Sequence, residues 1–122
     1  MLLAVCEDRG IASELVPRIA TGFCGGIARS DGMCGAVTGA VMAIGVALGR
    51  NDPGGSRDAD YTAVRKLLDG FAEVFGSINC GELLGCNLGT PEGQAFYKEN
   101  RLSQECRRYT EEATAMAATL LA

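Results

Sequence analysis

The sequence predicts an all-α protein: a compact single-domain bundle of about five helices around a buried, Gly/Ala-rich central helix. With 122 residues, 48% of them hydrophobic, the chain has the usual size of one domain and enough apolar side chains for one core. No segment keeps the apolar-polar alternation of a half-buried strand. Apolar residues instead recur every three or four positions, in segments separated by glycine and proline. We therefore expect one helical domain over residues 1–122.

The N-terminal part of the chain predicts two short helices. The first covers the opening ten residues and ends at Gly10. The second covers residues 15–20, with Ser13 as its N-cap and Pro17 in its first turn, where proline is tolerated. The glycine-rich residues 22–32 are expected to form a loop that leads into the central helix.

The central helix is predicted from about Met33 to Leu48. Two sets of small or apolar side chains recur along it at helical spacing: Cys34, Val37, Val41, Ile44 and Leu48, and Ala36, Ala40, Ala43 and Ala47. A helix without a polar face belongs in the middle of a domain. The 18 uncharged residues between Asp31 and Arg50 approach the length of a membrane span, but five of them are glycine, so we expect no membrane-spanning helix.

The C-terminal part predicts three helices after a connector at residues 50–57. An amphipathic helix over residues 61–75 ends at Gly76. A single turn is expected after Asn79, and a short helix after the N-cap Thr90. The last helix begins near Ser103, runs to the end of the chain and turns Cys106 toward the core.

Composition excludes several classes of function. The net charge of −4, with scattered charges, argues against a nucleic-acid groove and a polybasic membrane patch. Histidine is absent, which removes Ser-His-Asp and Cys-His catalysis and every imidazole metal site, so a metal would need sulfur or carboxylate ligands. The N-terminus carries no export signal, and a cytoplasmic location is expected.

The six cysteines are the candidate functional residues. Cys34 and Cys80 are placed at predicted helix starts, where free backbone N–H groups and the helix dipole favour a thiolate, so both are candidate catalytic residues. Cys24 and Cys86 are further candidates, whereas Cys6 is expected to fill space in the core. The spacings match no zinc ribbon, Cys-x-x-Cys motif or ferredoxin run.

In combination, three motifs resemble the C_GCAxxG_C_C family. Residues 34–39 read Cys-Gly-Ala-Val-Thr-Gly, residues 78–85 hold Ile-Asn-Cys followed by Leu-Leu-Gly, and Cys106 follows. The resemblance extends from Ile19 to Tyr109, and it matches Cys34, Cys80 and Cys106 to the cysteines of the family's motifs. It implies a redox role and, through a related domain in a multihaem cytochrome, iron–sulfur ligation. It also implies a link to membrane transporters, because members are often encoded near transporter genes.

The family also expects a cysteine ahead of its first helix, and this chain begins at Met1 within the expected helix. Cys6 does not replace that cysteine. Either a cysteine upstream of Met1 completes the set, or Cys24 or Cys86 does so.

Three functions remain open on the sequence. In the first, Cys34, Cys80 and Cys106, with Cys24 or Cys86, bind an iron–sulfur cluster or another thiolate-ligated metal for electron transfer or redox sensing. In the second, a metal-free dithiol–disulfide oxidoreductase uses Cys34 as the attacking thiolate and Cys80 as the resolving thiol. In the third, the chain is a non-catalytic helical adaptor or oligomerisation domain, such as a homodimer. The first two require a redox partner.

Overall fold

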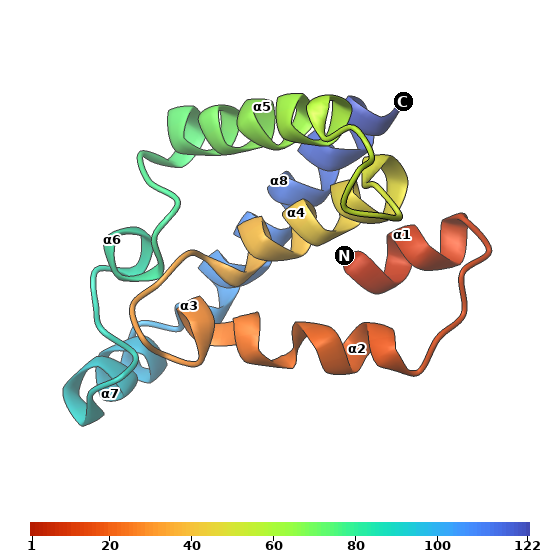
Figure 1. The fold of residues 1–122 in the computed structure, drawn as a ribbon. Helices are drawn as coiled ribbons and strands as arrows, with labels where there is room; N and C mark the ends of the chain where they lie inside the picture. Colours follow the sequence, from red (N-terminus) through yellow and green to blue (C-terminus); the bar gives the residue numbers. More distant parts are fainter.

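The computed structural model describes residues 1–122 and confirms the all-α prediction (Figure 1). The only β-type pairing is an isolated antiparallel bridge between Met33 and Asn79. The helices are α1 (Leu2–Asp8), α2 (Leu15–Ala20), α3 (Cys24–Ile27), α4 (Gly35–Leu48), α5 (Asp58–Phe75), α6 (Cys80–Leu84), α7 (Pro91–Glu99) and α8 (Ser103–Leu121), with a 3-10 turn at Thr21–Phe23. Eight α-helical segments exceed the predicted number of about five, because α3 and α6 are single turns within glycine-rich segments.

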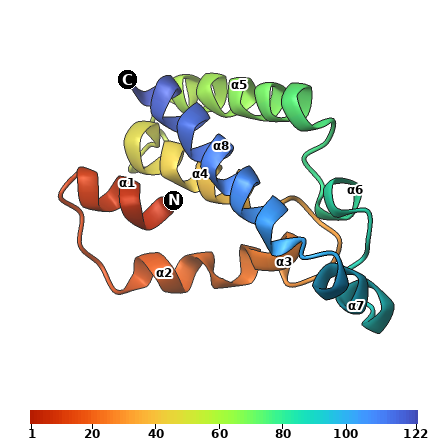
Figure 2. The same cartoon turned by 180° about the vertical axis from the view of Figure 1, so that it is seen from behind.

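The core lies where α4, α5 and α8 meet, and α1 packs against α4 as well (Figures 1 and 2). Helix α4 carries no charged residue and buries side chains along its length: Val37, Thr38, Ala40, Ala43 and Ile44. Helices α5 and α8 each bury one side chain per turn at a spacing of four residues: Ala63, Leu67 and Phe71 on α5, and Tyr109, Ala113 and Ala117 on α8. The small residues on α4 and α8 let these helices approach closely.

Three aromatic rings connect α5 with α8. Phe75 lies 4.8 Å from Phe71 and 4.9 Å from Tyr109 between ring centroids, the latter edge to face. The Tyr109 hydroxyl then donates a hydrogen bond of 3.1 Å to the carbonyl oxygen of Leu83 in α6. This bond joins α6, a helix of only five residues, to α8 in the core.

Helix ends follow the predicted capping in part. The Thr90 hydroxyl accepts a hydrogen bond from the Gly93 N–H at 3.0 Å, as an N-cap does. The Ser13 hydroxyl accepts from the Leu15 N–H at 3.2 Å, but α2 begins one residue later than a Ser13 cap requires. Helix α2 leaves Leu15 and Ile19 exposed, so its sequence period does not mark a buried face. None of the helices is both long and apolar enough to cross a bilayer.

Candidate functional site

A short antiparallel pairing brings two helix starts together. The Cys34 N–H donates to the Ile78 carbonyl at 2.8 Å, and the Cys80 N–H donates to the Gly32 carbonyl at 2.9 Å. Cys34 is the N-cap residue of α4, and Cys80 is the first residue of α6. The two predicted catalytic cysteines, 46 positions apart in sequence number, therefore follow directly on one backbone bridge.

Two glycines let α3 approach these helix starts. Gly26 is buried with a φ of 70°, and a Cβ there would lie 2.5 Å from the Cβ of Cys80 and 3.2 Å from its sulfur. A Cβ on Gly35 would lie 3.2 Å from the carbonyl oxygen of Phe23 and 3.6 Å from the Cα of Cys24. Only glycine fits both contacts as they stand, and this close packing carries Cys24 to the site.

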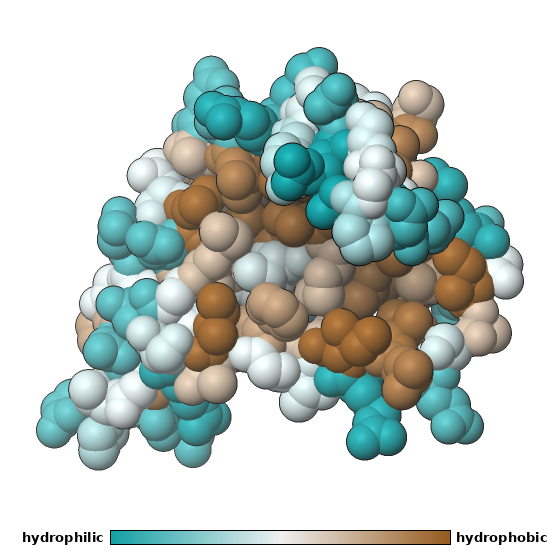
Figure 3. Space-filling model, viewed as in Figure 1, coloured by the Kyte–Doolittle hydropathy of each residue, from teal (hydrophilic) through white to brown (hydrophobic).

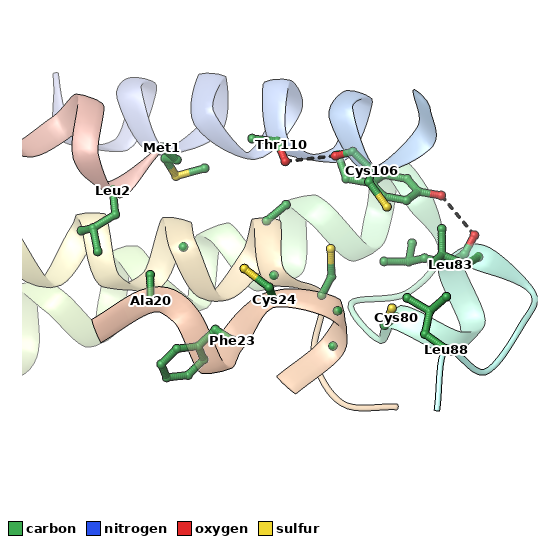
Figure 4. Close-up of a pocket in the computed structure, with 18 of the residues that line it drawn as sticks. Met1, Leu2, Ala20, Phe23, Cys24, Cys80, Leu83, Leu88, Cys106 and Thr110 are labelled. Carbon is green, nitrogen blue, oxygen red and sulfur yellow. Dashed lines mark hydrogen bonds between the residues drawn. The ribbon is translucent and has the colours of Figure 1, made fainter. Parts of the chain in front are cut away.

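A cavity of about 400 Å³ forms between α3, the start of α4, α6 and α8. Its lining is mostly apolar and includes four of the five predicted site cysteines: Cys24, Cys34, Cys80 and Cys106. Cys24 and Cys106 lie on opposite sides of it, on α3 and α8, while Cys80 lies beside Leu88 near one end (Figure 4). We call this space the thiol cavity. Cys86 does not line it, and Cys6 is buried away from it in the α1 packing.

Burial controls the acidity of the thiols. Burial raises the pKa of Cys34 above its ordinary value, although the backbone N–H groups of Ala36 and Val37 act to lower it. The prediction that a helix-start position favours the Cys34 thiolate over its thiol is therefore wrong in its net direction, because loss of solvent outweighs the N–H groups. Burial, reinforced by the charges of Cys34 and Cys106, raises the pKa of Cys80 to about 11.

The thiols also influence one another through charge. The Cys86 pKa is raised by burial and by Cys106, and the Cys80 pKa responds to Cys34, Cys106 and Cys86. Because charge interactions of this kind require proximity, Cys86 belongs to the same neighbourhood although it is outside the cavity wall. In the reduced protein at neutral pH, Cys34, Cys80 and Cys86 are thus mostly protonated, neutral thiols.

Tyr97 is a site residue that the sequence did not reveal. Its hydroxyl donates a hydrogen bond to the sulfur of Cys106 at 3.7 Å, and the ring lines the thiol cavity. Burial and the contact with Cys106 raise the pKa of Tyr97 to about 12, so the hydroxyl remains a proton donor. No local motif links a tyrosine on α7 with a cysteine on α8, and only the folded chain pairs them.

The cysteines as placed do not form a metal site. All six are free thiols, and nowhere do three cysteine, aspartate or glutamate side chains gather closely enough to hold a metal ion. A donor set of thiols without histidine suits iron–sulfur clusters, zinc or copper(I). The chemistry of the donors therefore fits such a group, but their arrangement in this conformation does not.

The fold and the site define a class of protein: a small helical protein with several neighbouring thiols around an apolar cavity. The chain belongs to the family described as "Putative redox-active protein (C_GCAxxG_C_C)", whose model matches residues 1–120. The match confirms the predicted family and extends beyond residues 19–109, over which the motifs predicted it. Comparison with curated proteins and with solved structures gave no match.

Proposed function

We propose that this protein exchanges electrons through a reversible disulfide between Cys34 and Cys80. The observation that carries the proposal is the backbone bridge, in which Cys34 pairs with Ile78 and Cys80 with Gly32 through bonds of 2.8 and 2.9 Å. The two cysteines are thus diagonal neighbours across the bridge, and closing the disulfide draws the two helix starts closer together. The charge of Cys34 is also the largest influence on the Cys80 pKa after burial. A redox role agrees with the description of the family.

The reaction is a thiol–disulfide exchange with a disulfide-bearing partner. The Cys34 thiolate attacks one partner sulfur and forms a mixed disulfide, and the partner's other sulfur leaves as a thiolate. The Cys80 thiolate then attacks the Cys34 sulfur and closes the Cys34–Cys80 bond, releasing the second partner thiolate. The two protons lost by Cys34 and Cys80 end on the two partner thiolates. Cys34 is assigned the attack because Cys80 is only 8% exposed.

Cys106 and Tyr97 have a supporting role in this proposal. Cys106 raises the pKa values of Cys80 and Cys86 by its charge, so a neutral Cys106 eases deprotonation of its neighbours. The Tyr97 hydroxyl donates to the Cys106 sulfur and so helps to hold its side chain in place.

The test is a disulfide map of the full chain. The reduced protein is treated with hydroxyethyl disulfide, a neutral reagent, and the free thiols are alkylated before peptide mass spectrometry. We expect a Cys34–Cys80 peptide pair, lost in both Cys34→Ser and Cys80→Ser and retained in the matched control Cys24→Ser. A second set, Cys34→Ala and Cys80→Ala, checked by circular dichroism, separates loss of chemistry from loss of fold. A map dominated by other pairs, or no disulfide at all, would refute the proposal.

An iron–sulfur cluster or another thiolate-bound metal is the second candidate. The observation in its favour is that cysteines from four separate segments, Cys24, Cys34, Cys80 and Cys106, line one cavity. Binding would require these side chains to move together, since they do not form a ligand sphere as placed. Anaerobic purification followed by iron and sulfide analysis tests it. Protein that stays colourless and free of metal after reconstitution would rule it out.

The homodimer, a redox partner linked to membrane transport and the cytoplasmic location stay predictions. Light scattering of the purified protein tests the dimer, and co-purification from cells tests the partner. The non-catalytic adaptor would gain support if Cys34→Ser and Cys80→Ser lowered stability while no reagent oxidised the wild-type protein.

A further inference from the structure

A second, more open cavity of about 1000 Å³ adjoins the thiol cavity. It lies between α3, α7 and the start of α8, which come together at one end of the molecule in both views (Figures 1 and 2). Four residues line both spaces: Cys24, Gly25, Leu88 and Tyr97. We call the second space the cationic groove, and it adjoins the thiol cavity at these four residues.

The charged residues of the cationic groove all have one sign. They are Arg29, Lys98 and Arg101, and no aspartate or glutamate lines the groove. None of the three forms an ion pair, since the one salt bridge of the chain joins Arg108 to Glu105. In a protein with a net charge of −4, three unpaired cations around one concave surface create a local positive field.

Two of these cations are held at unusual backbone positions. Arg29 has a φ of 63° and Arg101 a φ of 51°, which few residues other than glycine adopt. The carbonyl of Arg29 packs against Gly89, where a Cβ would lie 2.6 Å from its oxygen. Strained backbone of this kind persists only where surrounding contacts enforce it, so the position of Arg29 at the groove is determined by the fold.

We propose that the two adjoining cavities together bind an organic dithiol, and its disulfide form, that carries an anionic group. The apolar, sulfur-bearing end enters the thiol cavity, whose wall is mostly apolar. The anionic end stays in the cationic groove near Arg29, Lys98 and Arg101. The substrate class is assigned from the contrast between the two spaces. A ligand with an apolar end and an anionic end is complementary to both, whereas a neutral dithiol is complementary only to the thiol cavity. This substrate class rests on the proposed Cys34–Cys80 disulfide.

The reaction balances without a further reagent. One thiolate of the bound dithiol attacks the Cys34 sulfur of the Cys34–Cys80 disulfide, and Cys80 leaves as a thiolate. The second substrate thiolate attacks the substrate sulfur of the mixed disulfide, and Cys34 leaves. Two electrons pass from the substrate to the protein, the substrate becomes a disulfide, and the two protons that it loses are taken up by Cys34 and Cys80.

Dihydrolipoate and dihydrolipoamide are matched probes, since the first carries a carboxylate where the second carries a neutral amide. Each is mixed with the oxidised full-length protein at low ionic strength, and the second-order rate of thiol appearance in the protein is measured. We expect dihydrolipoate to react about tenfold faster, as three weak charge contacts would give, and the preference to shrink as salt is added. The triple variant Arg29→Gln, Lys98→Gln, Arg101→Gln should lose the preference.

The control is the triple variant Arg65→Gln, Lys66→Gln, Arg107→Gln, which removes the same charge from exposed positions outside the groove. It should keep the preference. Equal rates for the two dithiols, or a preference that survives in the groove variant, would overturn the proposed substrate class and leave the Cys34–Cys80 disulfide standing. If hydroxyethyl disulfide forms no Cys34–Cys80 bond, the proposed function itself fails, and the substrate class fails with it.

Discussion

Replacing Gly26 with alanine should damage the site through two separable costs. Gly26 has a φ of 70°, and placing a Cβ in this left-handed region costs about 1 to 2 kcal/mol. The new Cβ would also lie 2.5 Å from the Cβ of Cys80, too close for two carbon atoms. Forcing an extra methyl group into a packed site adds about 1 to 3 kcal/mol, so Gly26→Ala should destabilise the protein by about 2 to 5 kcal/mol.

Two other glycines with left-handed φ values, Gly10 and Gly25, separate these costs. Gly10 has a φ of 69° and nothing within 4 Å of the Cβ position, so Gly10→Ala should show only the backbone cost of about 1 to 2 kcal/mol. Gly25, with a φ of 68°, would meet only the flexible side chain of Arg29 at 3.2 Å, so Gly25→Ala should cost little more. The excess loss in Gly26→Ala is therefore chiefly the contact with Cys80, with a smaller part from the Gly32 carbonyl oxygen at 3.2 Å.

Urea unfolding of the three reduced variants measures the difference, with the midpoint and the slope reported separately. The disulfide map under hydroxyethyl disulfide should also show a reduced yield of the Cys34–Cys80 pair in Gly26→Ala, because a displaced Cys80 no longer follows the backbone bridge in the same geometry. Equal destabilisation in all three variants would refute the close approach of α3 to Cys80, and the argument for how Cys24 reaches the site would fail with it.

Three further measurements test the thiols and their support. The pKa values of Cys34 and Cys80 are raised in the folded protein, the latter to about 11, so above the ordinary thiol pKa the folded state binds more protons than the unfolded state. The free energy of unfolding of the reduced protein should therefore fall as the pH rises from about 9 to 11. A flat profile that Cys80→Ala does not alter would contradict this. Cys24 is exposed and should be alkylated by iodoacetamide before Cys34 and Cys80 at neutral pH, which mass spectrometry of a time course would detect. Earlier labelling of Cys34 would contradict this order. Tyr109→Phe removes the hydroxyl that donates to the Leu83 carbonyl in α6 and should lower the free energy of unfolding by about 1 kcal/mol. The control Tyr61→Phe should cause no measurable change, because the Tyr61 hydroxyl has no partner within the chain. Equal effects would mean that the Tyr109 hydrogen bond contributes nothing.

The long helices could be predicted from sequence because their evidence is local. On α5 and α8 the buried positions repeat every four residues, and Gly76 ends α5 at a φ of 86°. Helix α3 could not be predicted, because Gly25 and Gly26 discourage an ordinary right-handed helix. In the structure both have left-handed φ values, and the N–H groups of Ala28 and Arg29 close the turn onto the carbonyls of Cys24 and Gly25. Its packing against Cys80 is a contact between residues 54 positions apart in sequence number.

The candidate site divides in the same way. The motif cysteines Cys34, Cys80 and Cys106 could be selected from residue order, and the structure brings all three to one cavity with Cys24. The pKa of Cys34 could not be predicted from the sequence, because two opposing effects act on it. The sequence shows only one of them, the backbone N–H groups at the helix start, which lower the pKa. Burial, which prevails, depends on how the folded chain packs Cys34 against the hydrophobic core.

Neutral thiols in an apolar cavity also bear on how the two cavities would work together. A reduced protein that keeps its protons resists oxidation by chance encounter with solvent oxidants, because the thiolate is the reactive form and its population is small. Exchange then depends on a partner that brings its own sulfur into the cavity and displaces water there. The unpaired cations of the groove lie outside the apolar wall, and none of them is among the groups that shift the pKa of Cys80. In the proposal they would attract an anionic substrate while the Cys80 pKa stays raised. Because the charges that would bind the substrate are separate from Cys34 and Cys80, the protein would discriminate by substrate charge while these two thiols stay mostly protonated between turnovers.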